Sequence, residues 1–278
     1  MPVERKRATN GPSKPGKPIN IERFSSFREK YARAPVVFKT CSDVPYAKTP
    51  ALRAVTEECL RSLLASESDQ EIVFNVLVIE SQKGADPYEG KNVRTIYPVE
   101  PFGYHAYMNI GIRQTSAPYV CLCNNDLYFH RGWATSILQS FAKNPELQST
   151  SPFCTRHHPS MGLAADSGLL LGYEIRREVA GWCLFFRRSM LDTTGLLDET
   201  FRFWFADNDY ARTLEKHHLP HALVTSSLVD HLESRTLDEE GEFRRRLLTS
   251  RAKIEFNRKW NGLSGLTYWR KVAQCNLK

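Results

Sequence analysis

The chain has 278 residues, 41% of them hydrophobic and 25% charged, which is enough for one large core or two smaller ones. No apolar run of about 18 residues occurs and the first twenty residues lack the apolar stretch of a secretory signal, so we expect no membrane-spanning segment. Seven cysteines without CxxC spacing favour a reducing, cytoplasmic compartment over a disulfide framework.

The positive charge lies at the two ends of the sequence. Of the formal net charge of +7, residues 1–18 contribute +4 and residues 241–278 contribute +8, so the 222 residues between them carry −5. Such ends are commonly solvated surface, and the alternative is contact with a polyanion such as nucleic acid or an anionic glycan. Because residues 9–18 are mostly Pro, Gly, Lys and Ser, we predict a disordered tail over 1–18, a folded domain over 19–240 and a basic helical extension over 241–278.

The first half of the domain alternates strands with helices. Short apolar runs predict strands over 35–41, 71–81, 93–98 and 118–123, and helical spacing predicts helices from Pro50, over 103–115, and from Trp133 to about Asn144. Strands and helices alternating at these spacings indicate right-handed βαβ crossovers. The sequence therefore predicts a single α/β domain with a mostly parallel central sheet flanked by helices.

The second half is less regular. We predict a strand over 179–188, a helix over 206–218 and a strand over 221–232, while residues 155–178 show no clear period. Long irregular segments inside a compact domain are often functional.

The Gly-rich loops that commonly hold phosphates do not occur in this sequence. No GxGxxG follows a predicted strand, and neither GxxxxGK[ST] nor a GxSxG nucleophile elbow is present. A bound nucleotide diphosphate would then need a divalent cation, held by oxygen ligands, to neutralise it. A sugar nucleotidyltransferase would be expected to carry a Gly-rich, Arg-containing loop after the first strand, and "KTCSDVPYAK" has none.

The stretch "APYVCLCNNDLYFHRGW" places a carboxylate directly after a buried strand. The apolar residues 119–123 are followed by Asn124, Asn125 and Asp126. Open α/β sheets keep their ligand crevices at the carboxyl ends of strands, so Asp126 suits a hard metal ion and Asn125 suits a water or a sugar hydroxyl. A simple turn explains the same residues equally well, because Asn and Asp are common in turns.

A second acidic pair follows an aromatic cluster in "FRFWFADNDYARTL". Asp207 and Asp209 begin the predicted helix, where one carboxylate can cap the helix and the other can compensate its dipole. If one of them faces the crevice, it is placed to act as a general base, with aromatic walls raising its pKa.

The histidines and cysteines are more simply interpreted as structural residues than as metal ligands. His231 ends the last predicted strand, where a lone histidine is more often structural than a ligand. The adjacent histidine pairs point in different directions, which argues against a structural zinc site. Cys121 and Cys123 share one side of a strand and are most simply core.

Four segments in a fixed order resemble the family 2 glycosyltransferases, which have the GT-A fold. They are "GYHAYMNIGI" before a strand, "CNNDLYFHRGW" as a DxD-type metal motif, "GWCLFFRRSMLDTTGLLDETF" before the acceptor site, and "FADNDYARTL" as the motif of the base. The resemblance extends from Val36 to Leu232, and "RAKIEFNRKWNG" resembles the closing segment of some relatives.

The resemblance implies inverting transfer of a sugar from a nucleotide-diphosphate sugar to an acceptor hydroxyl, with Mn²⁺ or Mg²⁺ as the cofactor. By matched position, Asp207 is the catalytic base, Asp126 is the metal ligand, and His231 helps hold metal or diphosphate. The residues assigned to donor binding are Glu80, Ser81, Asn109, Asn124 and Asn125. Two positions depart from the family pattern, because Asn124 replaces the first acidic residue of the metal motif and Ala206 replaces a Glu that often precedes the base.

The acceptor stays open at this point. A soluble or lipid-linked glycan suits the resemblance, while the basic ends suit peripheral contact with an anionic membrane or a hydroxymethylated DNA base as acceptor. A non-catalytic nucleic-acid-binding protein is the alternative from another class. It would explain the basic ends but would leave the carboxylates without a role.

Overall fold

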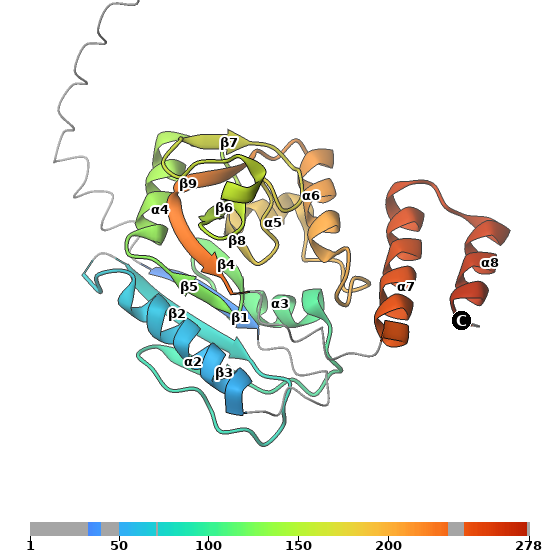
Figure 1. The fold of residues 1–278 in the computed structure, drawn as a ribbon, viewed down its shortest axis with the longest axis horizontal. Coiled ribbons are helices and arrows are strands. Elements are labelled where there is room, and N and C mark those ends of the chain that lie inside the picture. Colours follow the sequence, from blue (N-terminus) through green and yellow to red (C-terminus); the bar gives the residue numbers. More distant parts are fainter. Residues whose placement is uncertain (1–32, 40–49, 71, 233–241, 277–278) are drawn as a thin grey trace, which may run out of the picture. The chain divides into compact units, whose positions relative to one another are not determined.

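The first half of the chain builds the parallel part of a central sheet. The computed structural model describes residues 33–39, 50–70, 72–232 and 242–276, and its elements fall within one compact unit, Tyr31–Lys278. Four strands pair in parallel in the spatial order β3-β2-β1-β4: β1 (Arg33–Lys39), β2 (Val73–Ile79), β3 (Val93–Ile96) and β4 (Tyr119–Asn124). The helix α2 (Pro50–Ala65) connects β1 to β2, and α3 (Tyr104–Arg113) connects β3 to β4 (Figure 1). All six elements lie where the sequence predicts them, and the predicted tail over 1–18 lies outside the described residues.

The second half adds shorter strands. These are β5 (Leu127–Phe129), β6 (Ser149–Cys154), β7 (Leu169–Leu171), β8 (Cys183–Arg187) and the long β9 (His221–His231). The helices are α4 (Trp133–Lys143), α5 (Leu191–Thr194) and α6 (Ala206–Lys216), with short 3₁₀ turns at His158–Met161 and Arg188–Met190. The predictions for β8, β9, α4 and α6 are confirmed, whereas β5, β6 and β7 were not expected from the sequence.

The sheet as a whole is mixed. Among the described residues it has nine strands, in the order β3-β2-β1-β4-β8-β6-β9-β5, with β7 paired to β9. β8 is antiparallel to β4 and β6, and both β5 and β7 are antiparallel to β9. The α/β fold with a flanked central sheet is confirmed, but the sheet is mostly parallel only in its first half, because β6 with β9 is the one parallel pair among the described strands of the second half. The short strands escape the apolar pattern because β5 and β7 have three residues each and β6 reads "STSPFC".

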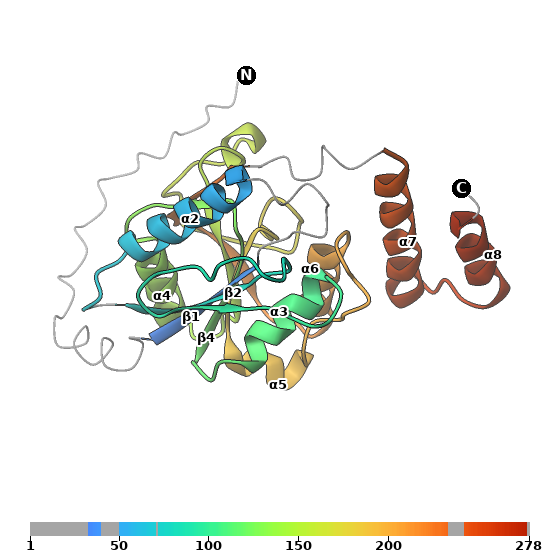
Figure 2. The same ribbon diagram turned by 90° about the horizontal axis from the view of Figure 1, so that it is seen from below.

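Helices cover both faces of the sheet. On one face, Tyr107, Met108 and Ile112 of α3 pack into a core cluster with Ile79 and Leu122, among others. On the opposite face, Trp133 of α4 stacks on Phe74 of β2 with a centroid separation of 6.2 Å. Figure 2 shows α2 and α3 on opposite sides of the strands. Burial on both faces explains why the parallel strands read as continuous apolar runs.

The described part of the basic C-terminal segment contains two helices. It forms α7 (Glu242–Trp260) and α8 (Gly265–Asn276), which share a small apolar cluster of their own: Ile254, Tyr268, Val272 and Cys275. In the part of the chain that the structure describes, no helix has the length and apolar character needed to cross a bilayer.

Candidate active site

The carboxyl ends of three neighbouring strands meet at one edge of the sheet. Lys39, at the end of β1, pairs with Ile79 of β2 on one side and with Asn124 of β4 on the other. Glu80 and Asn125 are therefore the first residues to leave the sheet at this edge. In α/β proteins such an edge is where ligands bind.

Glu80 is held firmly at this edge and is only 5% exposed. Its carboxylate accepts the Gln82 N–H at 2.8 Å and the Tyr88 hydroxyl at 3.2 Å. Burial and the charge of Glu80 raise the pKa of Tyr88 to about 12, so the hydroxyl keeps the proton that it donates. Ser81 follows and is half-buried. The predicted nucleotide-binding pair thus lies at the sheet edge, with Glu80 in a fixed orientation.

The strand β5 brings Asp126 and His231 together. Asp126 immediately precedes β5, and Leu127 of β5 pairs directly with His231 at the end of β9. The Asp126 carbonyl also accepts the Leu232 N–H at 2.9 Å. As a result, His231 Nε2 lies 3.4 Å from Asp126 Oδ1. The two residues predicted to hold a metal are therefore adjacent.

The spacing of this pair fits two ligands of one metal ion. Two ligand atoms at about 2.1 Å from an octahedral ion, at right angles to one another, lie roughly 3 Å apart. The measured separation of the Asp126 and His231 atoms is 3.4 Å, so only a small approach is needed. A carboxylate suits both Mg²⁺ and Mn²⁺, whereas an imidazole ligand favours a transition metal. The pair therefore suits Mn²⁺ better than Mg²⁺.

Trp182 fixes the plane of the His231 ring. The two rings stack with centroids 5.0 Å apart and planes inclined by 13°, and His157 packs edge-on against the indole at 5.2 Å. The Trp182 carbonyl accepts the Asn124 N–H at 2.9 Å, which ties the start of β8 to the end of β4. Trp182 is 7% exposed, and its Nε1–H has no hydrogen-bond partner among the described residues.

Asp207 lies in the first turn of α6, against Gly181. A Cβ on Gly181 would come within 2.8 Å of the Asp207 Cβ, so glycine alone leaves room for this approach. Burial raises the pKa of Asp207, and the Asn208 N–H at 2.9 Å and the charge of Arg176 reduce that rise. Phe205, just before the helix, has a left-handed φ of +63°, which is strained for a bulky residue.

The structure separates Asp207 from Asp209. Trp260 Nε1 donates to Asp209 Oδ1 at 2.7 Å, and Lys259 Nζ lies 2.7 Å from the same oxygen and 2.8 Å from Asp198 Oδ2. Asp209 is thus 3% exposed and anchors α7 to α6. Of the two carboxylates that the sequence offers as a base, only Asp207 faces the segment that carries Gly181 and Trp182.

A chain of contacts connects the two acidic centres. Gly181 packs on Asp207, the next residue Trp182 stacks on His231, and His231 lies beside Asp126. Residues from four separate parts of the sequence therefore surround one region at the end of β4. This arrangement can hold a cation on one side and remove a proton from a hydroxyl on the other.

Asn109, predicted to bind the donor, has a different place in the structure. It is 1% exposed, its Nδ2 donates to the Leu197 carbonyl at 2.8 Å and to Glu199 Oε1 at 2.9 Å, and its Oδ1 accepts the Leu197 N–H at 3.0 Å. The neighbouring His105 is bonded in the same way to the Asp198 carbonyl at 2.8 Å. These side chains brace the loop before α6, so we leave Asn109 out of the proposed donor site.

The amides at the end of β4 differ in their contacts. Asn125 Nδ2 donates to Thr56 Oγ1 of α2 at 2.8 Å, which holds the turn before Asp126 in place. Asn124 is half-buried at the strand end. Both predicted donor residues therefore lie beside Asp126, with Asn125 also supporting the turn.

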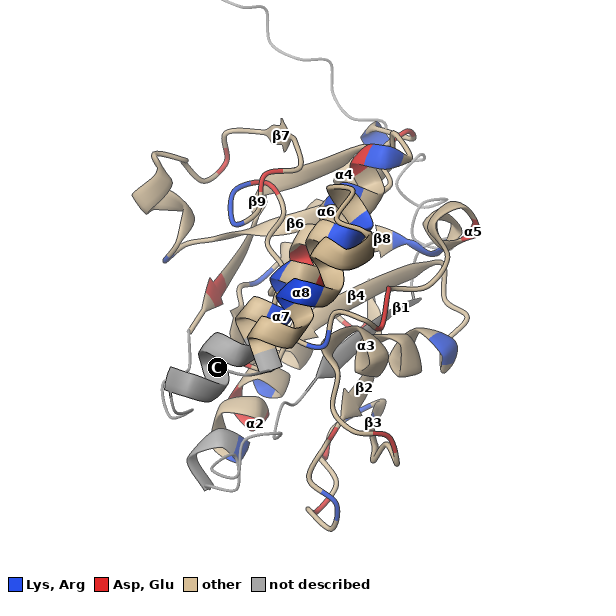
Figure 3. Ribbon diagram, turned by 90° about the vertical axis from the view of Figure 1, so that its right-hand side faces the viewer, with Lys and Arg blue, Asp and Glu red and all other residues tan. Residues whose placement is uncertain are grey.

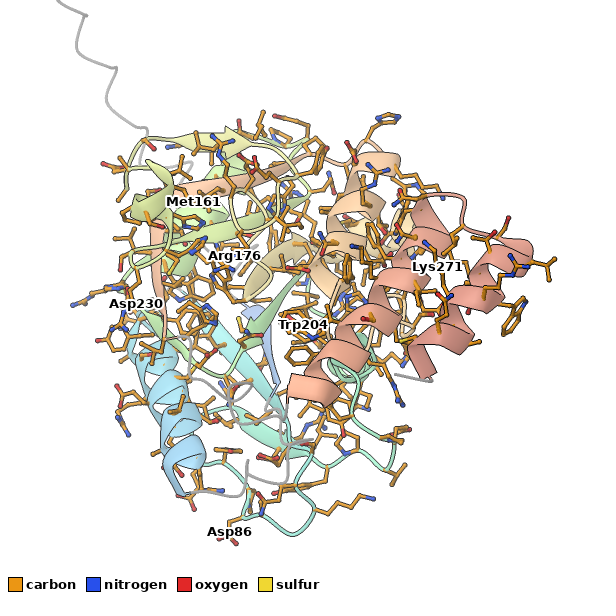
Figure 4. The ribbon with its side chains drawn as sticks, turned by 45° about the vertical axis from the view of Figure 1, so that its right-hand side comes forward. Asp86, Met161, Arg176, Trp204, Asp230 and Lys271 are labelled. Atoms are coloured by element: carbon orange, nitrogen blue, oxygen red, sulfur yellow. The ribbon has the colours of Figure 1, made fainter. Side chains whose placement is uncertain are left out.

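Two residues of the site were missed by the sequence reasoning. Trp182 was read as part of a strand and of the segment before the acceptor site, without a role of its own, although a Gly-Trp pair soon after a long irregular segment is an available signal. Arg176 lies in that segment (labelled in Figure 4), has a left-handed φ of +69°, and acts electrostatically on Asp207. No periodicity could have placed it there, because its position depends on how the loop folds back.

The comparison with protein families identifies the chain. The model described as glycosyl transferase family 2 matches residues 53–192, which is 140 of the 278 residues. The chain belongs to glycosyl transferase family 2. This confirms the family that the motifs predict. The matched range contains Asp126 and Trp182 and ends before Asp207 and His231, whose roles therefore depend on the geometry described above.

Two solved structures have a similar fold. GalNAc-T7, solved with UDP, GalNAc and Mn²⁺, has a TM-score of 0.54 and 10% identity over 73% of this chain. The mannosyltransferase PcManGT from Pyrobaculum calidifontis, in complex with GDP-Man and Mn²⁺, has a TM-score of 0.54 and 13% identity over 84% of this chain. The chain spans 44% and 66% of these two proteins, respectively. At such low identity the likeness confirms the GT-A fold alone. None of the curated proteins matches the sequence significantly.

Proposed function

We propose that this family 2 glycosyltransferase moves a sugar from a nucleotide-diphosphate donor to an acceptor hydroxyl, with Mn²⁺ bound by Asp126 and His231. The observation that carries the proposal is the contact chain from Asp126 through His231, Trp182 and Gly181 to Asp207. It joins a candidate cation site to a candidate base. The similar proteins solved with UDP or GDP-Man and Mn²⁺ support the same class of donor.

Different residues of the candidate site bind the cation, bind the donor and accept the proton. When bound, the cation supplies positive charge where the leaving diphosphate becomes more negative. Asp126 and His231 hold it, and Trp182 keeps the imidazole ring in one plane. Glu80 and Ser81 bind the nucleoside end of the donor at the adjacent strand end. Asp207 takes the proton of the acceptor hydroxyl, which then attacks the anomeric carbon from the face opposite the diphosphate, and the configuration inverts.

Thermal unfolding with candidate donors tests the donor class. We expect one nucleotide-diphosphate sugar to raise the unfolding temperature in the presence of Mn²⁺ and to have a much smaller effect with EDTA. A ligand at about 100 times its Kd stabilises the folded state by roughly 2.7 kcal/mol. The matched control is the corresponding nucleoside monophosphate, which lacks the diphosphate. If no UDP-, GDP-, CDP- or dTDP-sugar shifts the transition with Mn²⁺, the proposed donor class is wrong.

The acceptor in this proposal is a hydroxyl of a glycan or glycolipid. A hydroxymethylated DNA base is a second candidate, because exposed cations lie on the C-terminal helices, including Lys253 of α7 and Arg270 and Lys271 of α8. Lys and Arg positions along α6, α7 and α8 are blue in Figure 3. Such cations can contact phosphates without reading a base.

The salt dependence of DNA retention separates the two acceptors. If DNA binds through these helices, replacing Arg270 and Lys271 together by Gln should reduce the slope of log affinity against log salt by about two units. The matched control replaces Lys83 and Lys91, two exposed lysines of the β2–β3 loop, and should leave the slope unchanged. A wild-type chain that retains no DNA at about 50 mM salt eliminates the DNA candidate and leaves the glycan.

A further inference from the structure

Three cysteine sulfur atoms converge on one point inside the sheet. Cys121 and Cys123 share one face of β4, and Cys183 begins β8 directly opposite Cys123 in the antiparallel register. The Sγ–Sγ distances are 3.1 Å between Cys121 and Cys123, 3.5 Å between Cys123 and Cys183, and 3.7 Å between Cys121 and Cys183. All three side chains are fully buried, and all three thiols are free. We refer to these three residues as the thiol triad.

Ordinary core packing explains why the thiol triad is buried but not why its three sulfur atoms lie so close together. A buried cysteine behaves as a small hydrophobic side chain, and even carbon atoms pack at separations of roughly 3.5–4.0 Å. Sulfur is larger than carbon, yet Cys121 and Cys123 are 3.1 Å apart. The S–H group is only a weak donor and sulfur a weak acceptor, so hydrogen bonds within the triad offer little attraction. Three sulfur atoms within 3.7 Å of one another are close enough to bind a single metal ion together.

We propose that the thiol triad binds one thiophilic metal ion of the Zn²⁺ or Cu⁺ class. The ligand atoms of all three residues lie within 4.8 Å of one another, and soft thiolates select such ions over Mg²⁺ and Mn²⁺. A zinc ion about 2.3 Å from each sulfur would lie about 1 Å outside the plane of the three sulfurs, which leaves a fourth position open. Cys59 of α2 is also buried, and its Sγ lies 3.9 Å from the carbonyl of Asn124, the residue after Cys123, so it is a candidate for a fourth sulfur ligand.

The binding step exchanges protons for the metal ion. A divalent ion displaces three S–H protons, forms three metal–sulfur bonds and gives a complex with a net charge of −1, with three protons released to solvent and no change in oxidation state. Because the triad is fully buried, the ion enters most readily while the chain folds. Cys123 directly precedes Asn124, and Cys183 directly follows Trp182, so a bound ion would cross-link β4 and β8 where both enter the candidate active site. The proposal does not depend on the proposed glycosyl transfer.

Cobalt as a spectroscopic probe tests the thiol triad. The reduced full-length chain is refolded with one equivalent of Co²⁺, and thiolate-to-cobalt charge-transfer absorption is measured in the near ultraviolet. We expect one thiolate-bound cobalt per chain, displacement by Zn²⁺, and an unfolding temperature several degrees above that of the metal-free chain. Cys183→Ser should lose the band. Cys275→Ser, which changes a buried thiol of α8, and Asp126→Asn, which changes the candidate Mn²⁺ site, should both retain it.

Two outcomes would overturn this assignment. One is a folded wild-type chain that shows no charge-transfer band, and the other is a band that survives Cys183→Ser unchanged. Since serine at a fully buried position can impair folding, Cys121→Ala is measured in parallel and circular dichroism establishes that each variant is folded. The wild-type result alone is decisive if no variant folds.

Discussion

Asp126→Asn should lower the rate of sugar transfer by about 10²-fold or more while leaving the fold intact. Asp126 follows the end of β4, its side chain is 9% exposed, and its Oδ1 lies 3.4 Å from His231 Nε2. Asparagine has nearly the same shape but no negative charge, so it holds a divalent cation weakly. In the proposed reaction the cation is needed where charge develops on the leaving diphosphate, so its loss should raise the energy of the transition state most. The measurement is kcat/KM for transfer at a fixed Mn²⁺ concentration.

The loss of transfer activity in Asp126→Asn should depend on the Mn²⁺ concentration. If Asp126 is a metal ligand, the variant should also lose the Mn²⁺-dependent thermal shift produced by the donor. Asp230→Asn is the matched control, because Asp230 lies one residue from His231 but is bonded within the chain to His130 at 3.0 Å and to Thr155. We expect it to change stability more than transfer. Full transfer activity in a folded Asp126→Asn variant would show that this carboxylate is only part of a turn.

The strands of the first half were predictable because the sheet there is covered on both faces. The continuous apolar run of β4 could hardly belong to an exposed surface, and the polar residues that follow it predicted the end of the strand at Asn124. The short strands β5, β6 and β7 were not predictable, because three residues carry no period and the buried Ser and Thr residues of β6 resemble a loop. Their burial depends on partners that lie far away in the sequence.

The candidate active site likewise depends on contacts between residues that are far apart in the sequence. Asp126 and His231 could each be named from sequence, but only the pairing of Leu127 with His231 places them together. Asn109 has the residue type of a donor ligand, and only its three hydrogen bonds to residues 197–199 show that it braces a loop. Trp182 gains its role through stacking on His231, a contact that no local pattern encodes.

Asp207→Asn should reduce transfer by about 10²–10⁴-fold while donor binding survives, because the base acts on the acceptor hydroxyl. Asp209→Asn is a matched control two residues away. Asp209 binds Lys259 and Trp260, so removing its charge should cost about 1–3 kcal/mol of the free energy of unfolding. Its effect on transfer per folded molecule should be small. Donor affinity by calorimetry, transfer rate and urea denaturation of both variants give the comparison.

Asp207→Asn and Asp209→Asn should differ in their effect on the free energy of unfolding. Burial raises the pKa of Asp207 above its value in the unfolded chain, so the folded state binds a proton more tightly and loses stability as pH rises through the folded pKa. Asparagine removes that ionisation, and Asp207→Asn should therefore be as stable as the wild type, or more stable, at neutral pH. Asp209→Asn should be less stable.

The pH profile provides the last test of Asp207. A base must be ionised to accept a proton, so kcat/KM of the wild type should fall as pH decreases through the raised pKa of Asp207, at a higher pH than an ordinary aspartate would give. The residual transfer by Asp207→Asn should lack this acid limb, and the product should have the anomeric configuration opposite to that of the donor by proton NMR. If Asp209→Asn is inactive and Asp207→Asn is active with its acid limb intact, the base is Asp209. The contacts of α7 would then have to open during catalysis, because Asp209 can accept a proton only after Lys259 and Trp260 release it.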